Sequence, residues 1–202
     1  PLLCDMDECW FRLKDTPDTY GVYPFHFELE IGHRLTGRTI EVMWRVKNPD
    51  SGELLFMIGG HPAFQVPEGK TIYDYTLVFR KEAGNHQEEL HYLAPNDQGY
   101  QVEEKTGSLK LKDGQAPVTK GFFDQILTYM FDGAQISSVG LLVDETPYVT
   151  IDCGDFPYLG VWTIEATHPF VCLEPWMGRC DDCGVTGDLS EKPVINHLKM
   201  DE

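Results

Sequence analysis

The chain has 202 residues, of which 42% are hydrophobic and 12% aromatic, and its formal net charge is −17. This length and composition suit one globular domain with a sizeable core and are unlike those of a disordered chain. The negative charge repels phosphate backbones and anionic lipid surfaces, so it argues against nucleic acid and membranes as partners and favours a neutral ligand.

The cellular compartment is predicted from signals that the sequence lacks. No run approaches the ~20 apolar residues that span a bilayer. The opening stretch "PLLCDMDECWF" has acidic residues and no basic segment, unlike a signal peptide. Six cysteines in 202 residues are too few for a dense disulfide framework. We therefore expect a cytoplasmic protein.

Strand patterns dominate the first part of the chain. Residues 25–48 alternate apolar and polar side chains on both sides of "LTGRT", which predicts a β-hairpin. The stretch "ELLFMIGG" (53–60) predicts a third strand, with His61 at its end. Residues 73–82 predict a further strand. The polar stretch 83–117 contains repeated turn signals and predicts loops and short hairpins.

The second half continues in short apolar segments. Residues 121–133 fit either a strand pair or a short helix. Residues 135–154 predict two strands joined at "DETP", and 158–164 and 170–176 predict two more, rich in β-branched and aromatic residues. No segment has a sustained helical period. The pattern predicts an all-β fold, an antiparallel β-sandwich, with residues 1–202 as a single domain.

Two ionisable residues stand where the sequence predicts strand ends. His61 lies in "IGGHPAFQVPEG" and Glu174 in "FVCLEPWMG", where Pro175 is expected to stop the strand. A carboxyl beside apolar walls has its charged form disfavoured and suits a general base near neutral pH. Trp176 offers an apolar face of the kind that stacks on a sugar ring. Taken singly, His61 also fits a turn or core histidine, and Glu174 a surface charge.

Other candidates are weaker. "CDDC" (180–183) resembles half of a zinc site, but no second half follows, and two aspartates raise thiol pKa values; we expect incidental loop cysteines and no metal. Asp155 suits a turn. Asp124 fits either an outward strand position or a site carboxylate. The sequence has no Walker loop, no G-x-G-x-x-G and no G-x-S-x-G motif.

The motifs "GGHPAFQVP", "DFPYLGVW" and "FVCLEPWMG", in this order, resemble the aldose 1-epimerase (galactose mutarotase-like) family, and its LacX-like branch in particular. "YPFHFELEI" and "TGDLSEKPVIN" fit the same branch. The resemblance extends over nearly all of the chain. It implies an antiparallel β-supersandwich with a sugar cleft. It also implies further family segments at both ends, so we expect terminal strands of the sandwich to be missing.

The resemblance implies interconversion of the α and β anomers of a free hexose, with no metal or organic cofactor and a small-molecule sugar as partner. By match of motif, Glu174 is the base and His61 the acid. Asp124 is matched to an acid that holds sugar hydroxyls, and Trp162 and Trp176 to cleft walls. The branch carries a further histidine and arginine in an N-terminal segment that has no counterpart in residues 1–202.

Three other functions stay open at this point. A non-catalytic carbohydrate-binding module keeps the cleft but need not keep both His61 and Glu174. A hexose-6-phosphate 1-epimerase needs basic residues for a dianion, and Arg179 is the only candidate near the C-terminal motif. A purely structural β-sandwich binds no sugar. The sequence leaves the sugar and the oligomeric state open.

Overall fold

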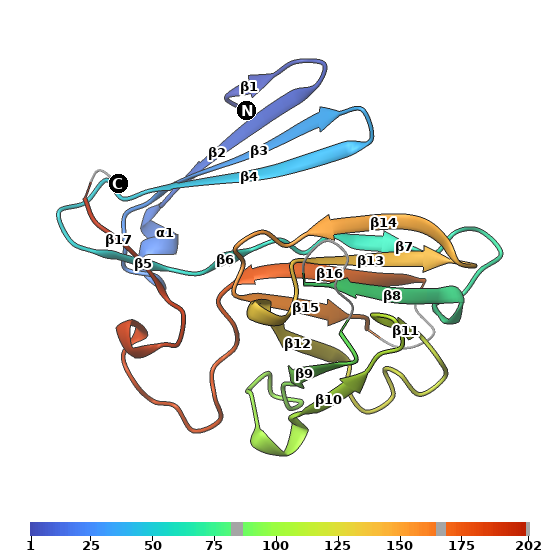
Figure 1. Cartoon of the computed structure of the whole chain (residues 1–202). Coiled ribbons are helices and arrows are strands. Elements are labelled where there is room, and N and C mark those ends of the chain that lie inside the picture. Colours follow the sequence, from blue (N-terminus) through green and yellow to red (C-terminus); the bar gives the residue numbers. More distant parts are fainter. Residues whose placement is uncertain (82–86, 165–168, 201–202) are drawn as a thin grey trace. The chain divides into compact units, whose positions relative to one another are not determined.

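The computed structural model describes residues 1–81, 87–164 and 169–200. The chain divides into two compact units: unit 1 contains Pro1–Phe56 and Ile195–Glu202, and unit 2 contains Met57–Val194 (Figure 1). The strands pair antiparallel throughout the named ladders, so the predicted all-β antiparallel fold is confirmed. The description of residues 1–202 as one domain stays a prediction. Among the described residues, no helix is both long enough and apolar enough to cross a membrane.

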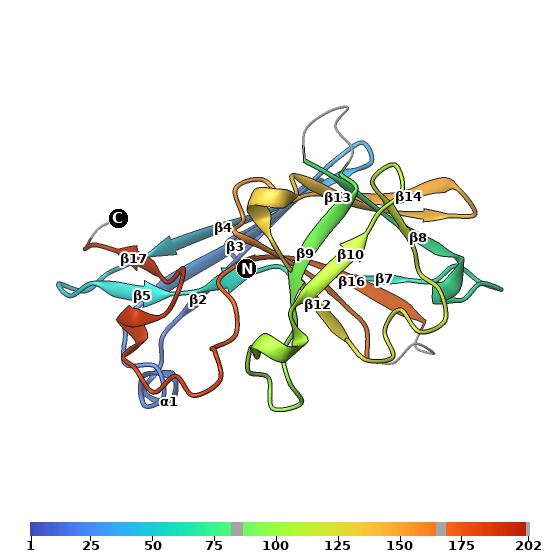
Figure 2. The ribbon, with the colours of Figure 1, turned by 60° about the horizontal axis from the view of Figure 1, so that its bottom comes forward.

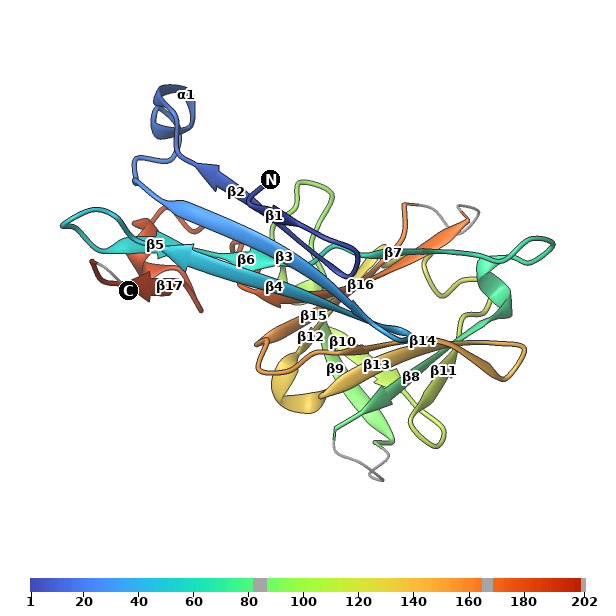
Figure 3. The same cartoon turned by 90° about the horizontal axis from the view of Figure 1, so that it is seen from above.

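Unit 1 contains a four-stranded sheet in the order β1-β2-β3-β4, whose strands β2 to β4 run alongside one another in Figure 3. Its elements are β1 (Leu3–Cys4), β2 (Glu8–Lys14), α1 (Pro17–Tyr20), β3 (Glu28–Thr36), β4 (Thr39–Lys47), β5 (Leu54–Phe56) and β17 (Asn196–Leu198), with β5 paired to β17. The predicted hairpin is confirmed as β3 and β4, which meet at Thr36 and Thr39. Gly37 has φ 61° in their turn, a conformation that favours glycine.

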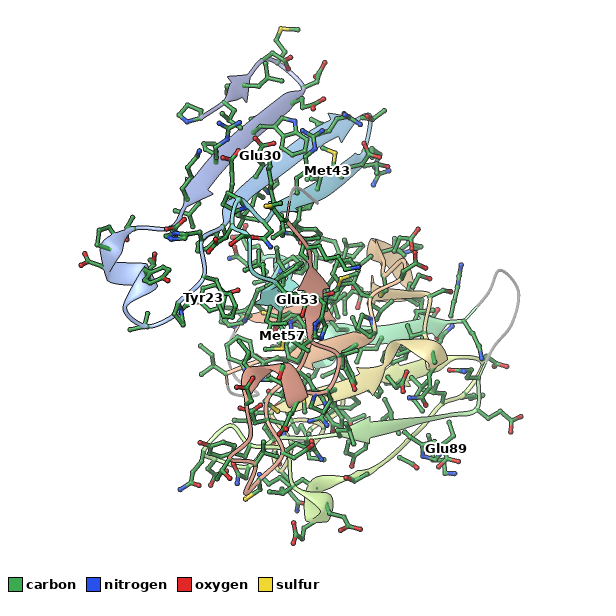
Figure 4. The ribbon with its side chains drawn as sticks, turned by 90° about the vertical axis from the view of Figure 1, so that its left-hand side faces the viewer. Tyr23, Glu30, Met43, Glu53, Met57 and Glu89 are labelled. Atoms are coloured by element: carbon green, nitrogen blue, oxygen red, sulfur yellow. The ribbon has the colours of Figure 1, made fainter. Side chains whose placement is uncertain are left out.

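The sheet of unit 1 has two unlike faces because its strands alternate. Charged side chains pair across strands on one face, among them Arg12 with Glu30 and Arg34 with Glu8, each at 2.7 Å. Figure 4 labels Glu30 on this sheet together with Met43 of β4. Exposed ion pairs of this kind contribute little stability each. The buried side chain on this face is Trp10, which is 5% exposed and lies under the guanidinium of Arg45.

Unit 2 contains two sheets. The larger runs β10-β9-β12-β15-β16-β6, with β7 also paired to β16, and the smaller runs β11-β8-β13-β14 (Figures 1 and 2). The strands are β6 (Ile58–Gly59), β7 (Ala63–Gln65), β8 (Tyr75–Arg80), β9 (Glu89–Leu93), β10 (Gly107–Lys110), β11 (Gln115–Pro117), β12 (Thr128–Asp132), β13 (Ser138–Val143), β14 (Thr146–Asp152), β15 (Tyr158–Trp162) and β16 (Phe170–Met177). Short 3₁₀ turns lie at Ile72–Asp74, Glu103–Lys105, Gly133–Gln135 and Leu189–Glu191.

The core of unit 2 is built from buried residues of both sheets. Its fully buried members include Leu77, Phe79, Val139, Leu141, Phe131, Leu159, Val161, Val171 and Leu173. Successive side chains of a strand point to opposite faces of the sheet. On β16, Val171 and Leu173 therefore belong to the core, and Cys172 and Glu174 lie on the opposite face of the larger sheet. That face holds the candidate site.

Three details of the predicted strands need correction. The strand expected over 53–60 breaks at Met57, because β5 pairs with β17 whereas β6 pairs with β16. Residues 121–133, left open between a strand pair and a helix, form a turn followed by the single strand β12. Within 83–117, short strands are confirmed where described, and residues 83–86 lie outside the described residues.

The prediction that Pro175 ends its strand is wrong, because β16 continues to Met177. The carbonyl of Pro175 accepts a hydrogen bond from the N–H of Gly60 at 3.0 Å. The backbone of Pro175 therefore faces residues 60–62, where the partner strand is interrupted. A proline is tolerated at such a place because no regular ladder bond needs its missing N–H.

Candidate active site

The position of His61 follows from an interrupted strand that keeps its register. Strands β6 and β7 both pair antiparallel with β16. The register pairs are Gly59 with Trp176 on one side of the interruption and Ala63 with Cys172 on the other. Both pairs continue one register, so residue 61 falls opposite residue 174. His61 is thus the cross-strand neighbour of Glu174, although 113 positions of sequence numbering separate them.

The two side chains form a close pair with unequal exposure. His61 Nε2 lies 3.4 Å from Glu174 Oε1; the histidine side chain is 61% exposed and the glutamate side chain 2%. Burial raises the pKa of Glu174 to about 7, against the opposing effects of the charge of His61 and a hydrogen bond from Trp176. The pair therefore combines a solvent-facing imidazole with a carboxyl whose charged form is disfavoured, an arrangement suited to proton exchange with a ligand.

Trp176 holds the other oxygen of the carboxylate. Its indole N–H donates to Glu174 Oε2 at 3.1 Å. Two glycines on the flanking strands make room for the ring: a Cβ at Gly59 would lie 2.7 Å from Trp176 Cδ1, and one at Gly160 would lie 2.8 Å from Cη2 and Cζ2. Gly160 is also the register partner of Glu174 on β15. The indole therefore lies in a slot across three strands, next to the carboxylate that it binds.

The remaining predicted residues fall in different places. The ring of Trp162 on β15 lies edge-on to His61, with ring centroids 5.3 Å apart. Asp124 is exposed in the turn before β12, where its N–H donates to the carbonyl of Gly121. Within the described part of the chain, no recorded contact joins Asp124 to His61 or Glu174. The structure thus gathers four of the five predicted side chains, and the roles of all five stay predictions.

Cys172 lies beside the pair of His61 and Glu174, and no motif in the sequence points to it. It lies two positions before Glu174 on the same face of β16 and is fully buried. The ligand atoms of His61, Cys172 and Glu174 all lie within 4.8 Å of one another, and no other group of this kind occurs among the described residues. Strand spacing alone places Cys172 beside Glu174, and this spacing is the signal that identifies it.

Arg179, the candidate for phosphate recognition, is already bound to a carboxylate. Its Nη1 and Nη2 lie 2.8 and 3.0 Å from the two oxygens of Asp182, which keeps the pKa of Asp182 below its usual value. Arg179 and Lys192 both line a cavity of about 380 Å³ beside Trp176. Lys192 is paired with Asp181 at 2.8 Å. Each cation at this cavity therefore has an acidic partner, which lessens its attraction for a dianion.

Comparison with known proteins identifies the family. A model of the family described as Aldose 1-epimerase matches residues 5–185. The chain is 26% identical over 192 residues to the chromosomal and plasmid LacX proteins of Lactococcus lactis, covering 93% of this chain and 62% of each relative. It therefore spans less than two thirds of their length.

Solved structures give the same result. A galactose mutarotase related enzyme from Lactobacillus acidophilus superimposes with a TM-score of 0.85 at 25% identity, covering 100% of this chain and 66% of the other. A galactose mutarotase-like protein from Lactobacillus casei gives a TM-score of 0.80 at 23% identity, covering 97% and 66%. With its strand order, its motifs and these matches taken together, the chain belongs to the aldose 1-epimerase family and resembles its LacX branch.

Proposed function

We propose that this chain carries the acid–base pair of an aldose 1-epimerase and interconverts the α and β anomers of a free hexose. Glu174 is the base and His61 the acid. The observation that carries the proposal is the 3.4 Å approach of His61 Nε2 to Glu174 Oε1 on the face of the larger sheet opposite the core. Membership of the family supports the reaction class.

The reaction needs an acid and a base close together, because both reacting oxygens of the sugar are bonded to the anomeric carbon. Glu174 accepts the proton of the anomeric hydroxyl, whose oxygen becomes the carbonyl oxygen of the open-chain aldehyde. The bond between that carbon and the ring oxygen breaks, and His61 gives its proton to the departing oxygen. Rotation about C1–C2 presents the other face, and the ring closes with the two roles reversed.

The environments of the two side chains support the assignment of Glu174 as the base and His61 as the acid. Burial of Glu174 disfavours its charged form and so strengthens it as a base, whereas exposed His61 can exchange its proton with water between turnovers. We propose Trp162 and Trp176 as apolar surfaces for the sugar. A role of Asp124 in holding sugar hydroxyls rests on the family resemblance alone.

The first test is NMR exchange spectroscopy between the anomers of glucose and of galactose in the presence of the chain. We expect acceleration by the chain, and a loss of about 10²–10⁴-fold in each of His61→Asn and Glu174→Gln, the usual contribution of a general acid or base. His91→Asn and Glu89→Gln are matched controls, because both residues lie on β9 of the same sheet, His91 against Ser108 and Glu89 against Lys110.

The test separates the proposed enzyme from the alternatives. Full exchange rates in both site variants would reject the acid–base assignment. A folded chain that binds the sugars, as seen by line broadening, without accelerating exchange would be a carbohydrate-binding module. A folded chain that neither binds nor accelerates would fit a structural role.

A further inference from the structure

The site contains a third reactive side chain that the proposed reaction does not use. Cys172 Sγ, His61 Nε2 and a carboxylate oxygen of Glu174 lie within 4.8 Å of one another. Thiolate, imidazole and carboxylate are the three side-chain ligands that zinc accepts, and catalytic zinc sites use three protein ligands with a fourth position open. In this chain the ligands come from two neighbouring strands of one sheet, with Cys172 and Glu174 on β16 and His61 in the gap opposite them.

The distances are close to those of a tetrahedral site. Zinc bonds of about 2.0–2.3 Å place tetrahedral ligand atoms roughly 3.3–3.8 Å apart. His61 Nε2 and Glu174 Oε1 are already 3.4 Å apart. The remaining contraction is about 1 Å from the 4.8 Å limit. His61 can move toward the two buried ligands, because its side chain is largely exposed and lies between two short strands.

One oxygen of Glu174 is available for such an ion. Oε1 is buried and makes no hydrogen bond, its recorded partner being His61 at 3.4 Å. Oε2 is held by the indole N–H of Trp176. A ligating carboxylate fixed through its second oxygen is the usual arrangement around protein metal sites. Oε1 is therefore the carboxylate oxygen that no hydrogen bond holds, and it can bind an ion.

We propose that His61, Cys172 and Glu174 bind a zinc-class divalent ion, and that the bound ion inhibits the epimerase. Binding forms bonds to Sγ, Nε2 and Oε1, and the proton of the thiol and that of any protonated Glu174 carboxyl leave to solvent. The ion then occupies the lone pair that Glu174 needs as a base and the nitrogen that His61 needs as an acid. Inhibition rests on the proposed function, whereas binding of the ion does not.

The three ligands differ in their exposure to solvent. His61 lies at the solvent side, Glu174 is buried beside it, and Cys172 is fully buried. The mixture of one thiolate, one imidazole and one carboxylate favours zinc over calcium or magnesium, which prefer oxygen ligands. Cys172 also allows metal binding to be tested apart from catalysis, because removing it deletes a metal ligand and leaves both His61 and Glu174 in place.

The test uses Co²⁺ as a spectroscopic probe and Zn²⁺ as the inhibitor, with the reduced chain. Co²⁺ bound to a thiolate gives a near-ultraviolet charge-transfer band, which needs no enzyme activity. We expect this band in the unmodified chain, its loss in Cys172→Ala, and its displacement by Zn²⁺. Cys180→Ala is the control, because Cys180 is a partly buried thiol of the same unit whose sulfur lies 3.9 Å from the sulfur of Met130.

Anomer exchange provides the second measurement. Zn²⁺ should slow exchange in the unmodified chain and in Cys180→Ala. In Cys172→Ala the metal-free rate should be kept, and the half-inhibiting Zn²⁺ concentration should rise on the order of 100-fold. Cys172→Ser serves if the alanine variant does not fold.

Two results would overturn the inference: no thiolate band with Co²⁺ in the folded, reduced chain, or a band that persists without Cys172. A chain that shows the band but no anomer exchange would retain the metal site and reject the proposed function instead.

Discussion

Two roles are open to Trp176, and loss of each changes a different kinetic constant. Its indole N–H binds Glu174 Oε2, which fixes the carboxylate, and its ring can also lie against a bound sugar. A residue that positions the base acts mainly in the transition state, so its loss lowers kcat. A surface that binds substrate and transition state equally changes KM instead. The two contributions can therefore be separated by a substitution that removes only the N–H.

Trp176→Phe removes the N–H and keeps an aromatic ring. We expect kcat for anomer exchange to fall by roughly 10- to 100-fold with little change in KM, because a hydrogen bond to a charged group contributes about 1.5–3 kcal/mol. Saturation kinetics by NMR exchange or polarimetry gives both constants. Trp10→Phe is the matched control, since it removes the indole N–H that Trp10 donates to Glu8 in unit 1. A raised KM with an unchanged kcat would assign Trp176 to the sugar surface alone.

Among the secondary-structure elements, the site depends on one interrupted strand and on two glycines in its neighbours. Residues 60–62, between β6 and β7, are not part of the β-ladder, so His61 has no ladder pair. Strands β6 and β7 on either side both pair with β16. Gly59 and Gly160 leave the space that the indole fills. Neither glycine has a positive φ, so the reason for glycine there is the close approach of Trp176 and not the backbone conformation.

Gly160→Ala tests this slot. Its Cβ would lie 2.8 Å from two atoms of the Trp176 ring, so the ring must move or the strands must part. We expect the free energy of unfolding to fall by about 1–3 kcal/mol, the usual cost of overpacking, as measured by urea denaturation followed by far-ultraviolet circular dichroism. Gly52→Ala is the control, because a Cβ there meets no atom within 4 Å. Equal free energies of unfolding for the two variants would show that the slot accommodates a Cβ at position 160.

The sequence predicts the individual strands better than it predicts which strands pair and in which register. Alternation identifies β3 and β4, and richness in β-branched and aromatic residues identifies β15 and β16. The predicted strand ends and the family motifs both point to His61 and Glu174. Their contact depends on the register of two segments more than 100 residues apart, which local pattern does not contain. Pro175 was misread for the same reason, since a proline inside a strand is acceptable only where the partner strand is broken.

For the whole molecule, the net charge bears on the choice between free and phosphorylated sugars. A charge of −17 repels a dianion at long range, and Arg179, the candidate to offset it, is bound to Asp182. Such fields change association rates by one or more orders of magnitude and weaken as salt rises. The alternative of a hexose-6-phosphate 1-epimerase therefore has weak physical support in the described residues.

We expect kcat/KM for glucose to exceed that for glucose 6-phosphate by roughly 10-fold or more at low ionic strength, with the difference shrinking as salt is added. The measurement is NMR anomer exchange at several salt concentrations. 6-O-Methylglucose is the control substrate, because it adds bulk at the same position without charge. A phosphorylated sugar that exchanges as fast as glucose at low salt would favour the alternative.

The slot around Trp176 also constrains how this sequence can evolve. Positions 59, 160 and 176 lie on three different strands, yet one indole ring fills the space that both glycines leave. A larger residue at either glycine is compatible with a smaller one at 176, whereas each change made alone costs either a clash or a cavity. Among descendants of this chain, substitutions at these three positions should therefore be found together.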